Sequence, residues 1–298
     1  MDQPGLTARW IPGVAPVAVL ILALNEAHQL EGLLENLQGF AQEVFLVDSL
    51  SRDETVTIAL RYGVTVVQRR FTDFGDQWNF ALRELPITAP WTLKLDPDER
   101  LTDALKAELL ATMARREAVG LRLPIRLHFM TRPLPVRLTL LRAWRTGAAH
   151  FSATRVNEHA HVAGPVVTLR GEIAHHDSPD LHHWWDKQNR YTTAEALSLA
   201  EGAPLADTPR LFGTALQRRM WLKRHFFRLP GRYQALFLYY WLIRGTWRAG
   251  FAGYAWAHLR AEVMRLREFK RREMALTGRP PRRWPSEPGE PDPRVPQA

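Results

Sequence analysis

The chain has 298 residues, 46% of them hydrophobic and 24% charged, so it is long enough to bury a full core and too apolar to be a disordered protein. It contains no cysteine, which excludes disulfides and thiolate metal sites. Its formal net charge of +9 at pH 7 indicates an anionic partner, with nucleic acid, a phosphate-bearing substrate and anionic lipid as the candidates.

The first third of the chain alternates strand-like and helix-like segments. Short apolar runs predict strands, and apolar residues at helical spacing, such as Leu30, Leu33, Leu34 and Leu37, predict helices. The predicted strands are Val17–Leu24, Val44–Val47, Val64–Val67 and Trp91–Leu95, and the predicted helices are Ala27–Leu37, Thr55–Tyr62, Asp76–Leu85 and Asp103–Arg116. This order favours a parallel sheet with helices on both faces.

The amino terminus and the region after residue 116 do not follow this alternation. No secretory signal peptide is expected, because Met1-Asp2-Gln3 lacks a basic start and the apolar run at residues 14–24 has the length of a core strand. After residue 116, strands without helical crossovers are predicted at Leu121–Leu127, Arg137–Leu141, Val166–Leu169 and Gly171–Ala174, and a helix at Leu181–Ala200.

A cluster of carboxylates follows the fourth predicted strand, in the run Asp96-Pro97-Asp98-Glu99. Burying ionised carboxylates without partners is costly, so a cation should lie there. At the carboxyl end of a strand, Asp96 and Asp98 are expected to point the same way, which suits Mg²⁺ or Mn²⁺ held by carboxylates and substrate phosphates. The alternative is a solvated acidic turn in which Pro97 ends the strand and Asp98 or Asp103 caps the next helix.

Polar residues also follow the first two strands, as Asn25-Glu26 and Asp48-Ser49. Ligands of parallel sheets bind beyond the carboxyl ends of the strands. We therefore expect the three strand ends to form one ligand site.

The chain carries four short blocks in order: Ala23–Glu26, Leu46–Thr55, Phe74–Leu82 and Asp96–Arg100. Together they resemble the family 2 inverting glycosyltransferases over roughly residues 15–200, and within them the bacterial branch that adds sugars to lipopolysaccharide core or lipid-linked glycans. The resemblance implies the GT-A fold of nucleotide-diphospho-sugar transferases. This is an α/β domain with a mostly parallel central sheet flanked by helices, here followed by a basic aromatic helical extension.

The resemblance also implies roles for individual residues on the donor side. Asn25 and Glu26 would lie beside the nucleoside, and Asp48, with Ser49 next to it, would bind the base. Gln77 and Asn79 would line the diphosphate or sugar side. The residues that depart from the family pattern are Leu50 in place of Gly, Arg52 in place of Thr and Trp78 in place of a basic residue.

The metal and the acceptor side follow from the same resemblance. Asp98 would coordinate the Mg²⁺ or Mn²⁺ that bridges the donor phosphates, with Asp96 at the ribose or metal shell and His176 near the ion. For His176, a polar strand end is the alternative. The run Arg155–His159 resembles the acceptor segment of the family, and its Glu158 would be the base that deprotonates the acceptor hydroxyl.

The C-terminal third is basic and aromatic, with fourteen basic residues against three acidic ones between Arg218 and Glu273. Its longest uncharged run, Tyr233–Ile243, is about half the roughly 20 residues needed to span a bilayer. We therefore expect residues 206–278 to form amphipathic helices at an anionic membrane surface. The alternative is a helical subdomain packed on the core, and nucleic acid is disfavoured because no RNA-binding module is present. Residues 279–298 are predicted to be disordered.

The sequence thus predicts an inverting, metal-dependent glycosyltransferase bound peripherally to the cytoplasmic face of a bacterial inner membrane. It would transfer a sugar from a nucleotide-diphosphate sugar to a lipopolysaccharide-core or polyprenyl-linked glycan. Residues 1–205 would form the GT-A domain, with a donor half at about 15–116 and an acceptor half at about 117–205. The alternatives are a degenerate, non-catalytic glycosyltransferase acting as a membrane-bound scaffold, and another nucleotide-dependent transferase.

Overall fold

The computed structural model describes residues 9–115, 117–151, 160–200, 208–213, 217–218, 220–221, 225–226 and 229–279 of the chain. The described residues form two compact units. The first comprises residues 9–128 and 137–176, and the second comprises residues 129–136 and those from 177 onward. The predicted boundary at residue 205 and all of the predicted tail at 279–298 except residue 279 lie outside the described residues.

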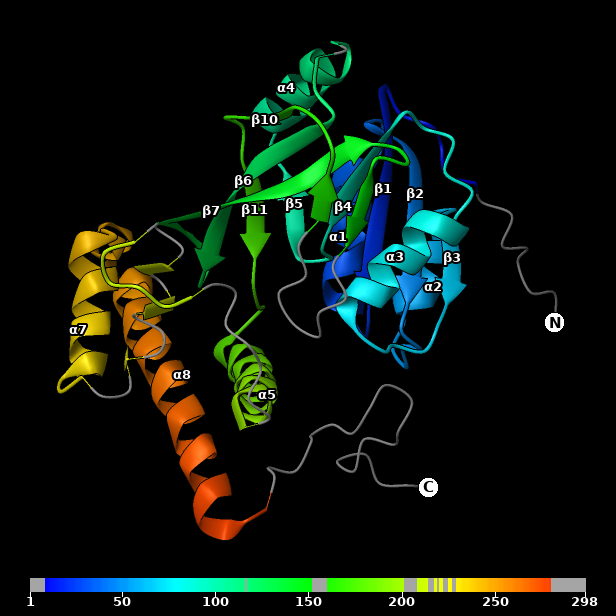
Figure 1. Cartoon of the computed structure of the whole chain (residues 1–298). Helices are drawn as coiled ribbons and strands as arrows, with labels where there is room; N and C mark the ends of the chain where they lie inside the picture. Colours follow the sequence, from blue (N-terminus) through cyan, green and yellow to red (C-terminus); the bar gives the residue numbers. More distant parts are fainter. Residues whose placement is uncertain are drawn as a thin grey trace, which may run out of the picture. The chain divides into compact units, whose positions relative to one another are not determined.

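The first unit begins with the alternation that the sequence predicts (Figure 1). Its elements are β1 (Ala15–Ala23), α1 (Ala27–Leu37), β2 (Ala41–Asp48), α2 (Thr55–Arg61), β3 (Thr65–Gln68), α3 (Phe74–Glu84) and β4 (Trp91–Leu95). These four strands pair in parallel in the order β3-β2-β1-β4. The predicted β-α order and the parallel arrangement are therefore confirmed.

Beyond β4 the sheet becomes mixed. The further elements are β5 (Glu99–Leu101), α4 (Asp103–Met113), β6 (Gly120–Phe129), β7 (Arg132–Arg145), β10 (Val166–Thr168) and β11 (Ile173–His176). The sheet continues from β4 in the order β7-β6-β11-β5, and β10 pairs with β6. A separate antiparallel hairpin joins β8 (Ala149–Phe151) and β9 (Ala160–Val162).

Two sequence expectations change here. The strand predicted at Arg137–Leu141 is the middle of the longer β7, whose start contains Pro133 and Pro135 and therefore does not read as a strand. The sequence does not predict the three-residue strand β5, because its first residue, Glu99, belongs to the acidic run. It pairs with β11 in antiparallel fashion.

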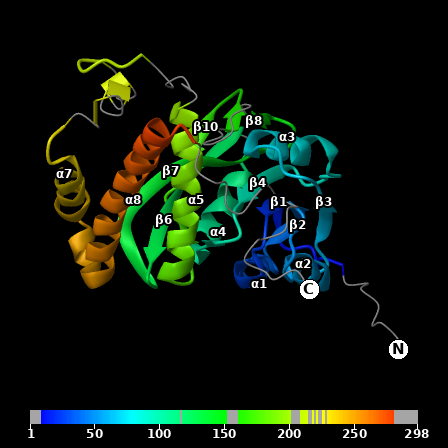
Figure 2. The same cartoon turned by 90° about the horizontal axis from the view of Figure 1, so that it is seen from below.

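The core of the first unit lies on both faces of the sheet. Side chains alternate along β1, so that Val17, Val19 and Ile21 face α1, while Ala18 and Leu20 face the side of α3. Figure 2 shows α1 and α2 on one face of these strands and α3 on the other. The predicted placing of helices on both faces is confirmed.

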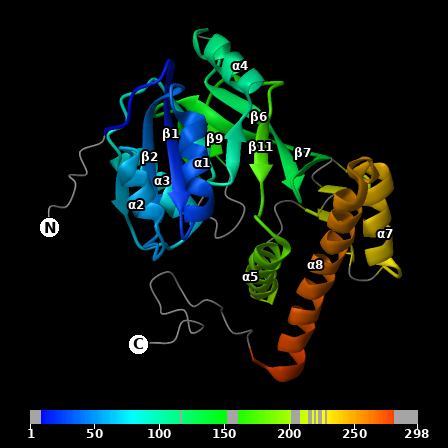
Figure 3. The ribbon, with the colours of Figure 1, turned by 180° about the vertical axis from the view of Figure 1, so that it is seen from behind.

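The second unit is helical in its described part. It contains α5 (Leu181–Ala200), α7 (Arg232–Leu238), the π-helical segment η2 (Tyr239–Ile243), the 3-10 segment η3 (Thr246–Ala249) and α8 (Gly250–Thr277). Helix α8 runs along α5 (Figure 3), where Arg267 Nη1 lies 2.8 Å from Glu195 Oε2. The buried Glu268 of α8 accepts from Arg232 Nη2 of α7 at 2.6 Å. None of the helices in the described ranges is both long and apolar enough to cross a bilayer.

Candidate functional site

Three parallel strands of the first unit end at one edge of the sheet, where the sequence predicts a ligand site. In the register of β1 and β2, Ala23 lies opposite Asp48, and β4 pairs in parallel with β1 on its other side. The loops that carry Asn25, Asp48 and Asp96 therefore leave the sheet next to one another.

Asp48 and Asn25 connect the loops that follow β2 and β1. The fully buried Asp48 carboxylate accepts hydrogen bonds from the Ser51 hydroxyl, from Ser51 N–H at 2.9 Å and from Gln68 Nε2 at 2.9 Å. Asn25 N–H donates to Ser51 Oγ at 2.8 Å, and Asn25 Oδ1 accepts from Arg52 N–H at 2.8 Å. The two loops thus form one connected polar layer, and contact of either residue with a nucleoside stays a prediction.

The other residues predicted on the donor side lie in two places. Glu26 precedes α1, and its N–H donates to Thr55 Oγ1 at 2.9 Å. Buried Gln77 of α3 donates from Nε2 to Ser49 Oγ at 3.3 Å. Asn79 faces away from them, since its amide exchanges two hydrogen bonds of 2.9 Å with the backbone of Phe151 in β8.

Arg69 is a residue of this region that the sequence pattern does not single out. Its guanidinium donates to Gln77 Oε1 at 2.6 Å and to Asp76 Oδ2 at 2.6 Å. These contacts orient the Gln77 amide, so that its other end faces Ser49. The signal that could have found Arg69 is its place directly after β3, at the same edge of the sheet.

Leu50 adopts a left-handed backbone with φ of 65°. That conformation costs a non-glycine residue about 1–2 kcal/mol, so the departure from Gly stores strain in the turn after β2. We expect Leu50→Gly to raise the free energy of unfolding by up to about 1 kcal/mol, because relief of strain exceeds the added chain entropy of glycine. Urea unfolding followed by circular dichroism measures this change.

The matched control is Leu60→Gly, since Leu60 lies in α2 and is exposed to a similar degree. Glycine in the last turn of this helix should lower the free energy of unfolding by up to about 1 kcal/mol. A loss of the same size at Leu50 would contradict the strain argument.

The acidic run after β4 forms a turn and not an extension of the strand. Glu99 N–H donates to the Asp96 carbonyl at 3.0 Å, and β5 begins at Glu99. The alternation expected of a strand therefore does not apply to Asp96 and Asp98. The next helix, α4, is capped by the Thr102 hydroxyl, which accepts from Leu105 N–H at 3.3 Å, and not by a carboxylate.

Arg142 of β7 supplies a cation to this turn. Its Nη2 lies 2.6 Å from Glu99 Oε1 and 3.0 Å from Asp96 Oδ2. Both Arg142 and Glu99 are buried, and Arg142 Nε and Nη1 have no hydrogen-bond partner within the described part of the chain. Arg142 is thus the cation that the sequence predicts beside Asp96 and Glu99. Asp98 instead contacts His175.

Burial and Arg142 act in opposite directions on the carboxylates. Burial raises the pKa of Glu99 to about 7, although Arg142 opposes this shift. Burial also favours the neutral form of Asp96, but Arg142 and Lys94 outweigh it and hold the pKa of Asp96 below its usual value. The Asp96 side chain is 40% exposed. Asp96 is therefore the ionised and accessible member of the pair.

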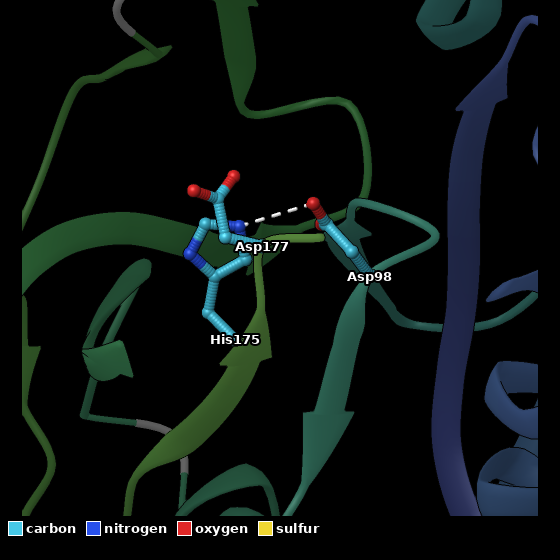
Figure 4. Close-up of side chains that lie close together, drawn as sticks. All are labelled: Asp98, His175 and Asp177. Carbon is cyan, nitrogen blue, oxygen red and sulfur yellow. Dashed lines mark hydrogen bonds and ion pairs between the residues drawn. The ribbon is translucent and has the colours of Figure 1, made fainter. Parts of the chain in front are cut away.

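His175 contacts Asp98, with 3.1 Å between His175 Nε2 and Asp98 Oδ2 (Figure 4). The sequence singles out His176, but successive side chains of β11 point to opposite faces. His176 stacks instead on His128 with ring centroids 4.7 Å apart, and only its backbone N–H reaches Asp98, donating to the carbonyl at 2.7 Å. The structure therefore brings His175, in place of His176, to the carboxylate.

The donor atoms around Asp98 fit a divalent ion. Asp98, His175 and Asp177, two residues further along the chain, each offer one ligand atom, and these atoms lie within 4.8 Å of one another (Figure 4). Carboxylate oxygens suit Mg²⁺ and Mn²⁺, and imidazole suits transition metals. The residues present are thus compatible with the ion that the sequence predicts.

Arg100 holds the turn that carries Asp98. Its guanidinium donates to the carbonyls of Pro97 at 2.7 Å, Glu99 at 2.8 Å and Gln29 at 2.7 Å. A Cβ at Gly32 would come within 2.9 Å of Arg100 Nη2, so glycine at this position of α1 leaves room for the guanidinium. Arg100 therefore fixes the turn to α1.

Residues 18–159 match the family profile described as Glycosyl transferase family 2. The lipopolysaccharide core biosynthesis glycosyltransferase LpsC of Rhizobium meliloti (strain 1021) is 28% identical over 253 residues, which are 80% of this chain and 85% of that protein. An uncharacterized glycosyltransferase of Rickettsia bellii (strain RML369-C) is 26% identical over 282 residues, 89% of this chain and 88% of that protein. Among solved structures, S. aureus TarS 1-349 in complex with UDP-GlcNAc superposes with a TM-score of 0.42 at 14% identity, covering 88% of this chain and 92% of that one.

Proposed function

We propose that the chain is a family 2 glycosyltransferase, which its residues 18–159 resemble, and that it transfers a sugar, with inversion, from a nucleotide-diphosphate sugar to a lipopolysaccharide-core or polyprenyl-linked glycan. The observation that carries the proposal is the group of Asp96, Asp98 and His175 at the edge where the parallel strands end. The acceptor class is supported by the name of the relative LpsC.

Asp98 and His175, with Asp177 as a third donor, would hold Mg²⁺ or Mn²⁺. Such an ion supplies Lewis acidity toward the negative charge that develops on a departing nucleoside diphosphate. Asp96, ionised and half-exposed, would bind the ribose or the shell of the ion. Arg142 keeps Asp96 ionised, and Asp98 would be the carboxylate of this turn that binds the ion.

The donor would lie along the polar layer at the strand ends. Asn25 and Glu26 would flank the nucleoside, and Asp48 and Ser49 would lie at the base. Gln77, which touches Ser49, would line the diphosphate side. Asn79 would act on the sugar side through the hairpin that it holds.

Glu158 would be the general base that removes the proton from the acceptor hydroxyl as it attacks the anomeric carbon. It lies outside the described residues, in the sequence between β8 and β9. We expect Glu158→Gln to lower the transfer rate by about 10²–10⁴-fold, because the amide cannot accept the proton. Donor binding should not change, since the variant keeps the shape of the side chain. Single-turnover transfer and calorimetric titration of donor separate the two effects.

Glu117→Gln is the matched control, because Glu117 is an exposed glutamate outside the site. It should transfer sugar at the unchanged rate. Loss of donor binding in Glu158→Gln would move Glu158 to the donor side, and full activity would remove it from the reaction.

We also place the protein peripherally at the cytoplasmic face of a bacterial inner membrane, where a lipid-linked acceptor is presented. Support comes from the basic, aromatic composition of residues 206–278 and from the relative LpsC. The direct test incubates the purified chain with a panel of labelled nucleotide sugars, Mn²⁺ or Mg²⁺, and membranes. Metal-dependent labelling of a glycolipid supports the proposal. A non-catalytic scaffold would label nothing and would bind no donor in a metal-dependent way.

A further inference from the structure

We propose that the turn at which α7 and α8 meet is a docking surface for an anionic lipid bilayer. This turn would be the part of the chain that contacts the membrane. The proposal rests on the proposed function in one respect, since a lipid-linked acceptor gives the protein a reason to bind a bilayer. The surface lies entirely in the second unit. The helices α7 and α8 meet at this turn in Figure 3. The surface, called here the apolar turn, consists of the exposed side chains of Tyr239, Leu242, Ile243, Trp247, Phe251 and Tyr254.

The apolar turn exposes large side chains close together in the sequence. Ile243 is 76% exposed, Phe251 74% and Trp247 50%. Exposed apolar side chains are normal when they are scattered singly, but a group of them marks a contact surface. Aromatic side chains are also the ones that lie at the headgroup level of a bilayer.

The turn is built rigidly, so this exposure belongs to the fold. Gly245 and Gly250 adopt φ of 72° and 61°, which ends one helical segment and starts the next. A Cβ at Gly253 would collide with the Thr246 carbonyl, so glycine is needed for η3 to pack against α8. Thr246 is buried, and its hydroxyl donates to the Tyr240 carbonyl at 3.1 Å.

An aromatic layer holds the two sides of the turn together. The ring of Tyr254 in α8 lies 5.6 Å from that of Phe237 in α7 and 6.3 Å from that of Trp241 in η2. Phe237 and Trp241 stack on each other at 5.6 Å. The exposed side chains thus project from a packed base and not from frayed helix ends.

The charge around the apolar turn selects the partner. Arg244 and Arg248 lie within it, and Arg248 places its guanidinium 4.8 Å from the Trp247 ring centroid. The sequence contains no aspartate or glutamate from residue 208 to residue 261. Arginine and aromatic side chains together fit anionic headgroups. A second copy of the same surface would bring like charges together, which disfavours self-association.

The test is sedimentation of the full chain with vesicles. Wild-type protein should bind vesicles of phosphatidylglycerol and phosphatidylethanolamine, more weakly as salt rises, and should bind phosphatidylcholine vesicles at least tenfold less. Ile243→Ser with Phe251→Ser should weaken binding by about 100-fold or more. Arg244→Gln with Arg248→Gln should weaken it by roughly 30-fold.

Matched controls lie further along α8. Phe269 is 57% exposed on the same helix, so Phe269→Ser makes the same chemical change away from the turn. Arg271→Gln does the same for charge. Both should bind vesicles as wild-type protein does. Thermal unfolding checks that every variant is folded. If the double variants unfold, the single variant Arg248→Gln still tests the surface, because Arg248 is exposed and lies outside the aromatic layer of Phe237, Trp241 and Tyr254.

Donor binding, measured by calorimetry without vesicles, should be equal in all these variants. If the proposed function is wrong, the protein will not bind donor in the calorimeter. If only the docking surface is wrong, donor binding will be normal and vesicle binding will fail. The docking proposal is overturned if wild-type protein ignores anionic vesicles at low salt, or if the turn variants bind as wild type. It is also overturned if wild-type protein is a dimer that Ile243→Ser with Phe251→Ser splits, because a second copy then covers the surface.

Discussion

Replacing Asp98 by asparagine is expected to lower the rate of sugar transfer on the order of 10³-fold. The amide keeps the size of the side chain but removes the negative charge that lies beside His175. An ion held with one charge fewer binds more weakly, so the variant should also need a higher Mn²⁺ concentration for half-maximal activity. Steady-state transfer at several Mn²⁺ concentrations and calorimetric titration of Mn²⁺ with nucleoside diphosphate measure both effects.

Asp103→Asn is the matched control for this experiment. Asp103 begins α4 five residues further along the chain, is exposed, and takes no part in the acidic turn. Its variant should transfer sugar at the unchanged rate. Wild-type activity and wild-type Mn²⁺ binding in Asp98→Asn would rule out an ion at this carboxylate.

Replacing Arg142 by methionine is expected to lower the free energy of unfolding by about 3–5 kcal/mol, the usual cost of removing one partner of a buried ion pair. Methionine fills much of the same volume, so the loss reports mainly the Glu99 carboxyl, whose side chain is 2% exposed and which without Arg142 must either stay charged unpaired or take up a proton. Urea unfolding at pH 7 measures it. Adding Glu99→Gln to Arg142→Met should restore part of the stability, because glutamine carries no charge and need not take up a proton on folding.

Arg137→Met is the control on the same strand. Arg137 is 56% exposed and pairs with Glu172 at the surface, and pairs of this kind contribute about 0–1 kcal/mol. Equal losses in Arg137→Met and Arg142→Met would show that burial of the Arg142 pair does not matter. Absence of rescue by Glu99→Gln would show that the buried Glu99 carboxyl is not the cause of the loss.

The GT-A fold implied by the resemblance is confirmed, and its first half could be predicted from local patterns. The strands from β1 to β4 are short apolar runs separated by helical spacing, and both signals lie within a few residues of one another. The polar residues at their ends could be found for the same reason. The strand β7 is predicted only in part, because its first residues include two prolines and are largely exposed.

The interior of the site could not be predicted, because it depends on pairing between distant segments. Arg142 reaches Asp96 from 46 residues away, through the antiparallel pairing of β7 with β4. Nothing local distinguishes it from the other arginines of that strand. Similarly, His175 rather than His176 meets Asp98 because of the register in which β11 lies opposite β5, with His175 opposite Glu99. A shift of one residue exchanges the two faces.

The turn at Leu50 illustrates a different limit. A left-handed residue after β2 would be expected from glycine, and leucine argues against it. The hydrogen bonds of Ser51 to Asp48 nevertheless hold the turn. Tertiary contacts therefore fix a backbone conformation that the local residue disfavours.

The two-way bond between Asn79 and Phe151 has a mechanical consequence. Because the amide bonds both the N–H and the C=O of Phe151, moving the last residue of β8 away from α3 would break two hydrogen bonds. Gln77, half a turn away on α3, rests on Ser49 at the end of β2. We therefore expect a ligand that displaces Ser49 to shift the end of β8 as well, because Gln77 and Asn79 lie on the same helix.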